Sequence, residues 1–158
     1  MSLLLIVAIV FALMEFSNVL FLYFRPGSTR ANSVGVFNAF EKSKQDSEIH
    51  NFIKYLVNWV AGTKLIFLSL LTVIIAFGGP VVQFFGIIAL VISISTFYWR
   101  LYPIMRTMDG EDQITPKNYS RTVAAMILVM IIIFSLALIL QYFGIELLPI
   151  TLPFPIQI

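Results

Sequence analysis

The chain has 158 residues, of which 59% are hydrophobic and only 11% are charged, whereas a soluble domain usually carries about 25% charged residues. It contains no cysteine, which excludes disulfides, thiol catalysis and thiolate metal ligands. The net charge is +2 and no polybasic block is present, so the composition does not favour nucleic-acid binding. The sequence predicts one integral membrane domain, residues 1–158, with the lipid bilayer as its solvent.

Four long apolar runs occupy most of the chain. The first is preceded by no positively charged segment, so we expect it to be a mature helix and not a secretory signal. Backbone polar groups in lipid must be satisfied internally, so each run is expected to be a helix. The sequence thus predicts an all-α, polytopic membrane protein, a four-helix bundle with transmembrane helices at about 3–24, 47–77, 81–102 and 116–143.

The second of these helices is predicted to be longer than a bilayer requires. Asp46 or Ser47 supplies a helix N-cap. Residues 64–77 alone are too short to cross about 30 Å of hydrocarbon, so the crossing should begin near Asn58. The preceding part is expected to form a long amphipathic cytoplasmic extension that lies at the interface, packs on neighbouring helices or docks a partner. Its apolar residues follow one helix face: Ile49, Phe52, Ile53, Leu56, Val57 and Val60.

Glycine and proline residues indicate the other helix ends. The sequence Gly78-Gly79-Pro80 predicts a tight turn between the second and third helices. Pro103 should end or kink the third helix. Thr115 is predicted to be the N-cap of the fourth helix, with Pro116 at its first position. Gly144 is expected to end that helix.

The last segment, residues 145–158, is apolar but contains three prolines. Proline interrupts both helices and central strands, so neither is expected here. We expect an extended tail that lies against the bundle or against another subunit.

The basic residues predict the orientation in the membrane. All ten Lys and Arg residues lie within residues 25–64 and 100–121. Cytoplasmic loops carry the excess of Lys and Arg in membrane proteins. The sequence thus predicts a protein of the cell membrane with two cytoplasmic basic loops and with both termini outside.

One carboxylate, Glu15, lies within the apolar runs. An ionisable group at the centre of a membrane helix costs about 2.5–3.5 kcal/mol on insertion scales, so such a residue suggests a functional site and needs a partner. Glu15 should lie about 13 Å from the cytoplasmic end of its helix, and Lys64 about 9 Å inside the second helix. Asn18 shares the face of Glu15 at spacing i, i+3. A Glu15–Lys64 pair is therefore expected.

Three further polar residues, Asn58, Ser95 and Thr96, fall in the same half of the membrane. Together with Glu15 and its partners they predict a polar pocket that opens to the cytoplasm and binds a ligand or ion. A purely structural role is the alternative, because intramembrane hydroxyls often bond to their own helix and amides can tie helices together.

No cofactor and no metal site is predicted. His50 is the single histidine, and the carboxylates at 109–112 lack the spacing of a calcium loop.

The sequence is compatible with three functions. The first is a homo-oligomer that binds or translocates an ion, a proton or a small polar solute. The second is a non-catalytic accessory subunit of a larger membrane complex. The third is a lipid-directed enzyme using loop residues such as Arg30, Asn32 and Asn38, but no nucleophile–base arrangement supports an enzyme.

Overall fold

The computed structural model describes residues 2–145, which are mainly helical and contain no strand. Four helical segments are long and apolar enough to cross a membrane. These segments confirm the predicted all-α class with four candidate spans, and they suggest an integral membrane protein. Apart from Ile145, the predicted apolar tail lies outside the described residues. The spans are α1 (Leu3–Phe24), α3 (Ser47–Phe77), the consecutive helices α4 (Pro80–Ser95) and α5 (Phe97–Gly110), and α6 (Tyr119–Tyr142).

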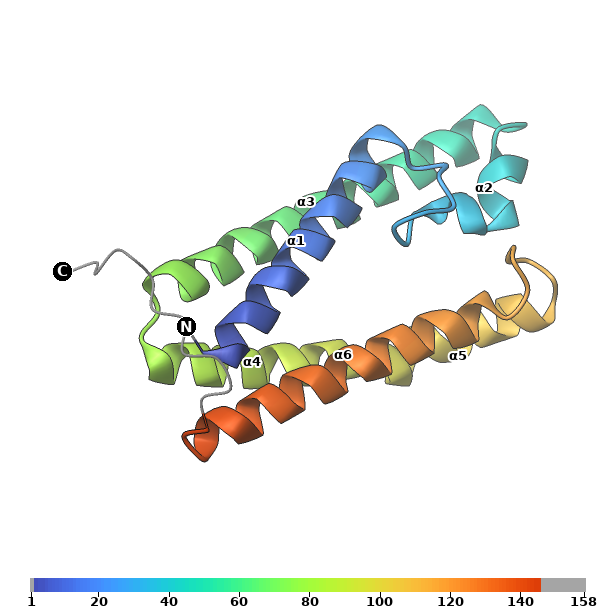
Figure 1. Cartoon of the computed structure of the whole chain (residues 1–158). Coiled ribbons are helices and arrows are strands. Elements are labelled where there is room, and N and C mark those ends of the chain that lie inside the picture. The colour runs from blue at the N-terminus through green and yellow to red at the C-terminus, as the bar shows by residue number, and fades with distance from the viewer. Residues whose placement is uncertain (1, 146–158) are drawn as a thin grey trace.

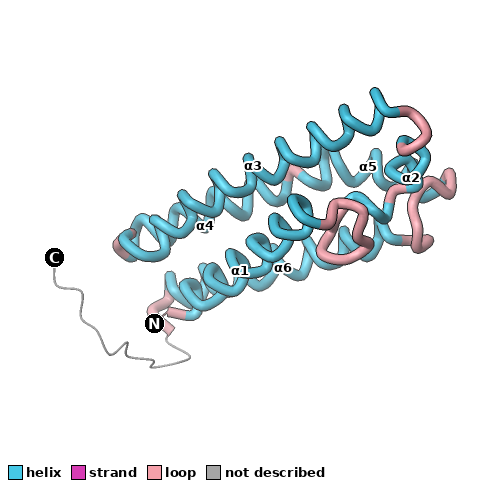
Figure 2. Tube along the Cα trace, turned by 90° about the horizontal axis from the view of Figure 1, so that it is seen from above, coloured by secondary structure: helices cyan, strands magenta, loops and turns pink. Residues whose placement is uncertain are grey.

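The helices form two layers that diverge along the bundle. In Figure 1, α1 and α3 lie side by side above α4, α5 and α6, and the two layers separate toward the short helix α2 (Asn38–Ser43). Figure 2 shows the same bundle from above, with α1 over α6 and α3 over α4. We call the end that holds the Gly78–Gly79 turn the turn end, and the end that holds residues 25–46 and 111–118 the loop end.

All four spans share one core at the turn end. Its most buried members come from every span, including Leu4 of α1, Leu71 of α3, Ile87 of α4 and Phe134 of α6. Phe134 is fully buried, and its ring meets Phe11 edge-to-face at 5.4 Å between centroids. This core holds the two layers together.

A second core, nearer the loop end, belongs to α1 and α3 alone. It contains Val19, Leu22, Val57, Ala61 and Leu68. No residue of α4, α5 or α6 is a buried member of it, so at this level the two layers are joined by loop contacts instead.

The ends of α1 and α3 agree with the predicted positions, 3–24 and 47–77. Asp46 is the N-cap of α3, because its carboxylate accepts hydrogen bonds from the Glu48 and Ile49 amides at 2.9 and 3.1 Å. The helix has 31 residues and is therefore about 46 Å long, against about 30 Å of hydrocarbon.

The stripe predicted to be covered on α3 is covered only in part. Val57 is buried, and Ile53 and Leu56 are half-buried. Ile49 and Phe52, nearer the start of the helix, are 52% and 60% exposed. Val60 is also exposed. The part of the face that packs on α1 is thus shorter than the apolar pattern.

The third span breaks at Thr96, which corrects the predicted single helix 81–102. α4 ends at Ser95 and α5 begins at Phe97, while Pro103 lies inside α5. The hydroxyls of Ser95 and Thr96 donate to the carbonyls of Val91 and Ser93, and the Thr96 amide also bonds to Ser93 in a tighter turn. Such hydroxyl bonds to the preceding turn bend helices, so the interruption comes before the proline.

The predicted N-cap of α6 at Thr115 is wrong, and the helix begins at Tyr119 instead of Pro116. The Thr115 amide is engaged elsewhere, since it donates to the Val36 carbonyl at 2.8 Å. The buried carboxylate of Asp109 takes the capping role. It accepts hydrogen bonds from the Asn118 amide at 2.9 Å and from the amide and hydroxyl of Ser120 at 3.1 and 2.6 Å.

The predicted end of α6 at Gly144 is confirmed within two residues. The helix ends at Tyr142, and Gly144 has a φ of 67°, the left-handed region. The Gly144 amide donates to Gln141 at 3.1 Å and the Ile145 amide to Leu140 at 2.9 Å, which is the Schellman pattern.

The two loops at the loop end are fastened to each other. Phe37 and Ile114 form an isolated antiparallel bridge. The Asn38 side chain also donates to the Asp112 carbonyl at 2.9 Å and accepts from the Thr115 hydroxyl at 3.1 Å. We call these contacts, between residues 36–38 and 112–115, the inter-loop bridge. Both basic segments therefore lie at the same end of the bundle.

Candidate functional site

The candidate site lies between α1 and α3, where only these two spans share a core. Glu15 and Asn18 stand on one face of α1 at spacing i, i+3, and Lys64 projects from α3. Measured from the turn end, Glu15 is about 18 Å along α1 and Lys64 about 20 Å along α3. The antiparallel packing of the two helices thus brings the three side chains to one level.

The Lys64 ammonium joins the other two side chains. Its Nζ lies 2.6 Å from Glu15 Oε2 and 2.6 Å from Asn18 Oδ1. The Glu15 and Lys64 side chains are each 28% exposed, whereas Asn18 is buried. We call these three residues the Lys64 cluster. The expected pairing of Glu15 with Lys64 is present, and Asn18 adds a second acceptor for the same ammonium.

A loop residue closes the cluster on its other side. The Asn18 amide nitrogen donates to the Ala31 carbonyl. Ala31 and its neighbour Asn32 both have left-handed backbones, with φ of 53° and 54°, which costs roughly 1–2 kcal/mol per residue for side chains other than glycine. Strain of this kind persists only where surrounding contacts hold it.

Two further contacts hold this loop in place. The Asn32 side chain accepts from the Tyr119 hydroxyl of α6 at 3.1 Å. Gly35 packs its backbone so closely on the preceding turn that a Cβ there would lie 2.1 Å from the Gly27 carbonyl oxygen. The loop therefore connects the Lys64 cluster in one layer to the start of α6 in the other.

The cluster is an ion pair that is partly exposed and keeps unused hydrogen-bonding capacity. A lysine ammonium has three donors, and two of them are directed at Glu15 and Asn18. A carboxylate can accept at both oxygens, and Glu15 uses Oε2 for Lys64. With more than a quarter of each charged side chain exposed, an anionic, cationic or zwitterionic group could take the place of either partner.

The structure does not bring the other three predicted site residues to this cluster. Asn58 donates to the Lys54 carbonyl of its own helix at 3.0 Å. Ser95 and Thr96 likewise bond to carbonyls within one turn, at 2.7 and 2.6 Å. These contacts are the local bonds expected of intramembrane polar side chains. A ligand role for them stays a prediction.

The loop residues considered for a lipid-directed enzyme have other partners. Asn32 bonds to Tyr119, and Asn38 belongs to the inter-loop bridge. The Arg30 amide donates to the Ser28 hydroxyl within its own turn. None of these contacts gathers the three side chains around one reacting position.

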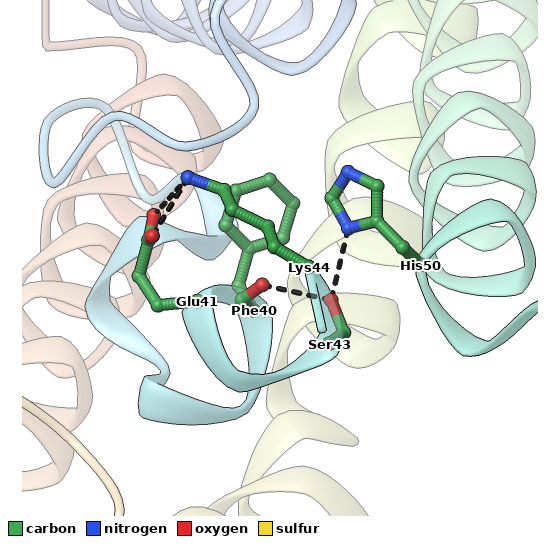
Figure 3. Close-up of polar contacts among 5 residues, drawn as sticks. All are labelled: Phe40, Glu41, Ser43, Lys44 and His50. Atoms are coloured by element: carbon green, nitrogen blue, oxygen red, sulfur yellow. Dashed lines mark hydrogen bonds and ion pairs between the residues drawn. The ribbon is translucent and has the colours of Figure 1, made fainter. Parts of the chain in front are cut away.

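A serine and a histidine meet at the corner between α2 and α3 (Figure 3). The Ser43 hydroxyl lies 2.8 Å from the Phe40 carbonyl and 2.9 Å from His50 Nδ1. Because the hydroxyl proton goes to the carbonyl, His50 Nδ1 must be the donor to Ser43 Oγ. The polarity is the reverse of a nucleophile–base pair, and Ser43 is buried. The contact fastens α2 to α3.

Two members of the site could not be anticipated from residue type. The Ala31 carbonyl is a backbone group, which every residue possesses. Tyr119 is separated from Asn32 by 87 positions, and no local pattern links them. Only Asn32 hints at the conformation of this loop, because asparagine tolerates the left-handed region better than most residues.

Comparisons of the sequence with protein-family models, curated proteins and solved structures found no match.

Proposed function

We propose that this protein binds or translocates a small polar solute, an ion or a proton at the Lys64 cluster. One observation carries the proposal: a lysine ammonium shared at 2.6 Å between a carboxylate and an amide, inside candidate membrane spans. Intramembrane ionisable residues are costly and usually mark ion or substrate pathways. The partial exposure of Glu15 and Lys64 supports exchange with a ligand.

We also propose that the loop end faces the cytoplasm and that the first part of α3 extends beyond the hydrocarbon as an amphipathic segment. The basis is the concentration of all ten Lys and Arg residues in the two segments at that end. Cysteines introduced at Gln45 and Gly79 test the orientation. We expect an impermeant maleimide to label Gly79→Cys in intact cells and Gln45→Cys only after permeabilisation. The opposite pattern would reverse the orientation.

The functional unit in this proposal is a homo-oligomer. Near the loop end only α1 and α3 share a core, and large apolar side chains such as Leu13 of α1 and Met126 of α6 stay exposed in the single chain, at 64% and 59%. Further copies could cover such faces at the level of the site. A single oligomeric mass of the purified protein, measured by native mass spectrometry, would support this arrangement.

An accessory subunit of a larger complex is the second candidate. The observation that favours it is the exposure of Ile49 and Phe52 at the loop end of α3, where a partner protein could cover them. This function predicts that the protein is stable only together with other polypeptides. Isolation as a stable self-assembly would count against it.

The binding proposal is tested with the protein in phosphatidylcholine nanodiscs. Thermal unfolding is measured against a panel of cations, carboxylates and amino-acid zwitterions, and proton flux is measured in proteoliposomes with an internal pH dye. We expect a stability shift or a flux in the native protein. It should be lost in the Glu15→Gln/Lys64→Met double variant, which leaves no unpaired charge, and kept in Lys44→Gln, whose ion pair with Glu41 is exposed. Neither shift nor flux in the native protein would refute the proposal.

A further inference from the structure

The basic residues at the loop end are largely free of carboxylate partners. Of the ten Lys and Arg residues, three form ion pairs among residues 2–145: Lys44 with Glu41, Lys64 with Glu15, and Lys117 with Asp112. Seven others form no ion pair in this described part of the chain, and all seven are exposed. They are Arg25, Arg30, Lys42, Lys54, Arg100, Arg106 and Arg121.

Two of these arginines follow an exposed tryptophan on α5. Trp99 is 75% exposed, and the Arg100 guanidinium lies 5.6 Å from the centre of its ring. Arg106 follows Trp99 by seven residues, two helical turns, so it stands on the same face of α5 about 10 Å further toward the loop end. Trp99 thus lies near the end of the apolar part of the third span, with cationic groups beside and beyond it.

The carboxylates nearest in sequence to this face are engaged elsewhere. Asp109 accepts hydrogen bonds from Asn118 and Ser120, and Glu111 accepts from Gln113. Asp112 pairs with Lys117. The positive charge of Arg100 and Arg106 is therefore available to an external anion.

We propose that Trp99, Arg100 and Arg106 bind the phosphate group of an anionic phospholipid. An indole ring prefers the boundary between hydrocarbon and headgroups, where one edge is apolar and the other is wet. A guanidinium matches phosphate oxygens with paired N–H donors. Charge complementarity favours an anionic over a zwitterionic headgroup, because each Lys or Arg near the surface adds to the attraction of anionic lipid. This proposal does not depend on a ligand at the Lys64 cluster.

The two tryptophans of the chain provide the test. Trp59→Phe leaves Trp99 as the only indole. Its fluorescence is measured in bilayers of phosphatidylcholine and phosphatidylglycerol, with bromine placed on the acyl chains of one lipid or the other. We expect phosphatidylglycerol to be preferred next to Trp99 by about five-fold, and less strongly at high salt, as for a surface electrostatic contact.

Variants assign the preference to the two arginines. In the Trp59→Phe background, Arg100→Gln/Arg106→Gln should bring the preference close to one, whereas Arg100→Lys/Arg106→Lys should keep most of it. The matched control, Lys44→Gln/Lys117→Gln, removes the same charge from residues that are already paired and should change little. Equal quenching by both lipids in Trp59→Phe would overturn the proposal. An equal loss in the control variant would also overturn it, since net charge alone would then explain the preference.

Discussion

At the turn end, Phe134 is fully buried in a core that takes side chains from all four spans, whereas at the loop end the second core belongs to α1 and α3 only. Lipid tails are as apolar as leucine, so helices in a bilayer associate through close packing and polar contacts and not through a hydrophobic drive. The turn end uses the first means. At the loop end, close packing joins α1 to α3, and polar contacts are added to it. The Lys64 cluster links these two helices, and the Asn32–Tyr119 contact and the inter-loop bridge link the two layers. The proposed binding site, the Lys64 cluster, thus lies with the polar contacts and outside the core that all four spans share.

The largest expected effect comes from unpairing the Lys64 cluster. Lys64→Met leaves Glu15 without its cation, and loss of one partner from a buried pair typically costs 3–5 kcal/mol. Because both side chains are partly exposed, we expect a loss of stability of about 3 kcal/mol, at the lower limit of that range. Thermal unfolding in detergent measures the change. The Glu15→Gln/Lys64→Met double variant should recover most of it, and additive losses would show that the two charges do not interact.

The turn-end core is broken by Phe134→Ala. The change removes on the order of 100 Å³ of packed side chain, and at about 24 cal/mol per Å³ the cavity costs about 2 kcal/mol. Because the surroundings of a membrane helix are also apolar, no term for transfer from water is added. The matched control on the same helix is Val129→Ala, since Val129 is 55% exposed. It should change the midpoint of thermal unfolding little. Equal losses in the two variants would mean that the turn end has no close-packed core.

A smaller effect is expected at the start of α6. Asp109→Ala removes the acceptor of the Asn118 and Ser120 amides, and loss of such a cap costs about 1–2 kcal/mol. Hydrogen exchange should rise in the first turn of α6. Asp112→Asn is the control, because its pair with Lys117 is exposed and such pairs contribute little, and because asparagine tolerates the left-handed φ of 54° at this position. Unchanged exchange in Asp109→Ala would assign the cap to another group.

The smallest effect on stability is expected at the Asn32–Tyr119 hydrogen bond, a polar contact between the two layers. Asn32→Gly keeps the left-handed backbone free of strain and removes the side chain, while Tyr119→Phe removes only the hydroxyl. Tyr119→Phe should cost about 0.5–1.5 kcal/mol, the usual net contribution of one hydrogen bond. Asn32→Gly should cost less, because glycine also relieves the left-handed strain. The double variant should cost less than the sum, which a double-mutant cycle on thermal stability measures. Strict additivity would show that the contact does not join the layers.

Local sequence signals predicted much of this fold, and nonlocal contacts explain the errors. The ends of α1 and α3 follow from apolar length, the Asp46 cap and the Gly78 turn. The break at Thr96 depends on hydroxyls that bond to the preceding turn, and the same residues also occur in unbroken helices. The start of α6 cannot be placed from local sequence, because its cap, Asp109, comes from the previous helix.

The candidate site likewise has one part that the sequence predicts and another that depends on nonlocal contacts. The pairing of Glu15 with Lys64 could be predicted from their similar depths in the membrane, because an isolated charge there is unfavourable and needs a partner. The Ala31 carbonyl could not be anticipated, since its position depends on two left-handed residues and on Gly35 packing against Gly27. Asn58, Ser95 and Thr96 were grouped by depth alone, and depth does not fix the direction in which a side chain points.

The Gly78–Gly79 turn divides the chain into two units, each with two candidate spans. Each unit starts and finishes at the turn end of the bundle: α1 with α3, and α4–α5 with α6. A Cβ placed on Gly79 would meet no atom within 4 Å, and exposed loop tips of this kind tolerate interruption. The chain could therefore be expressed as two separate polypeptides, divided at this turn. Each would insert as a helical hairpin, and the two would reassemble through the turn-end core and the inter-loop bridge.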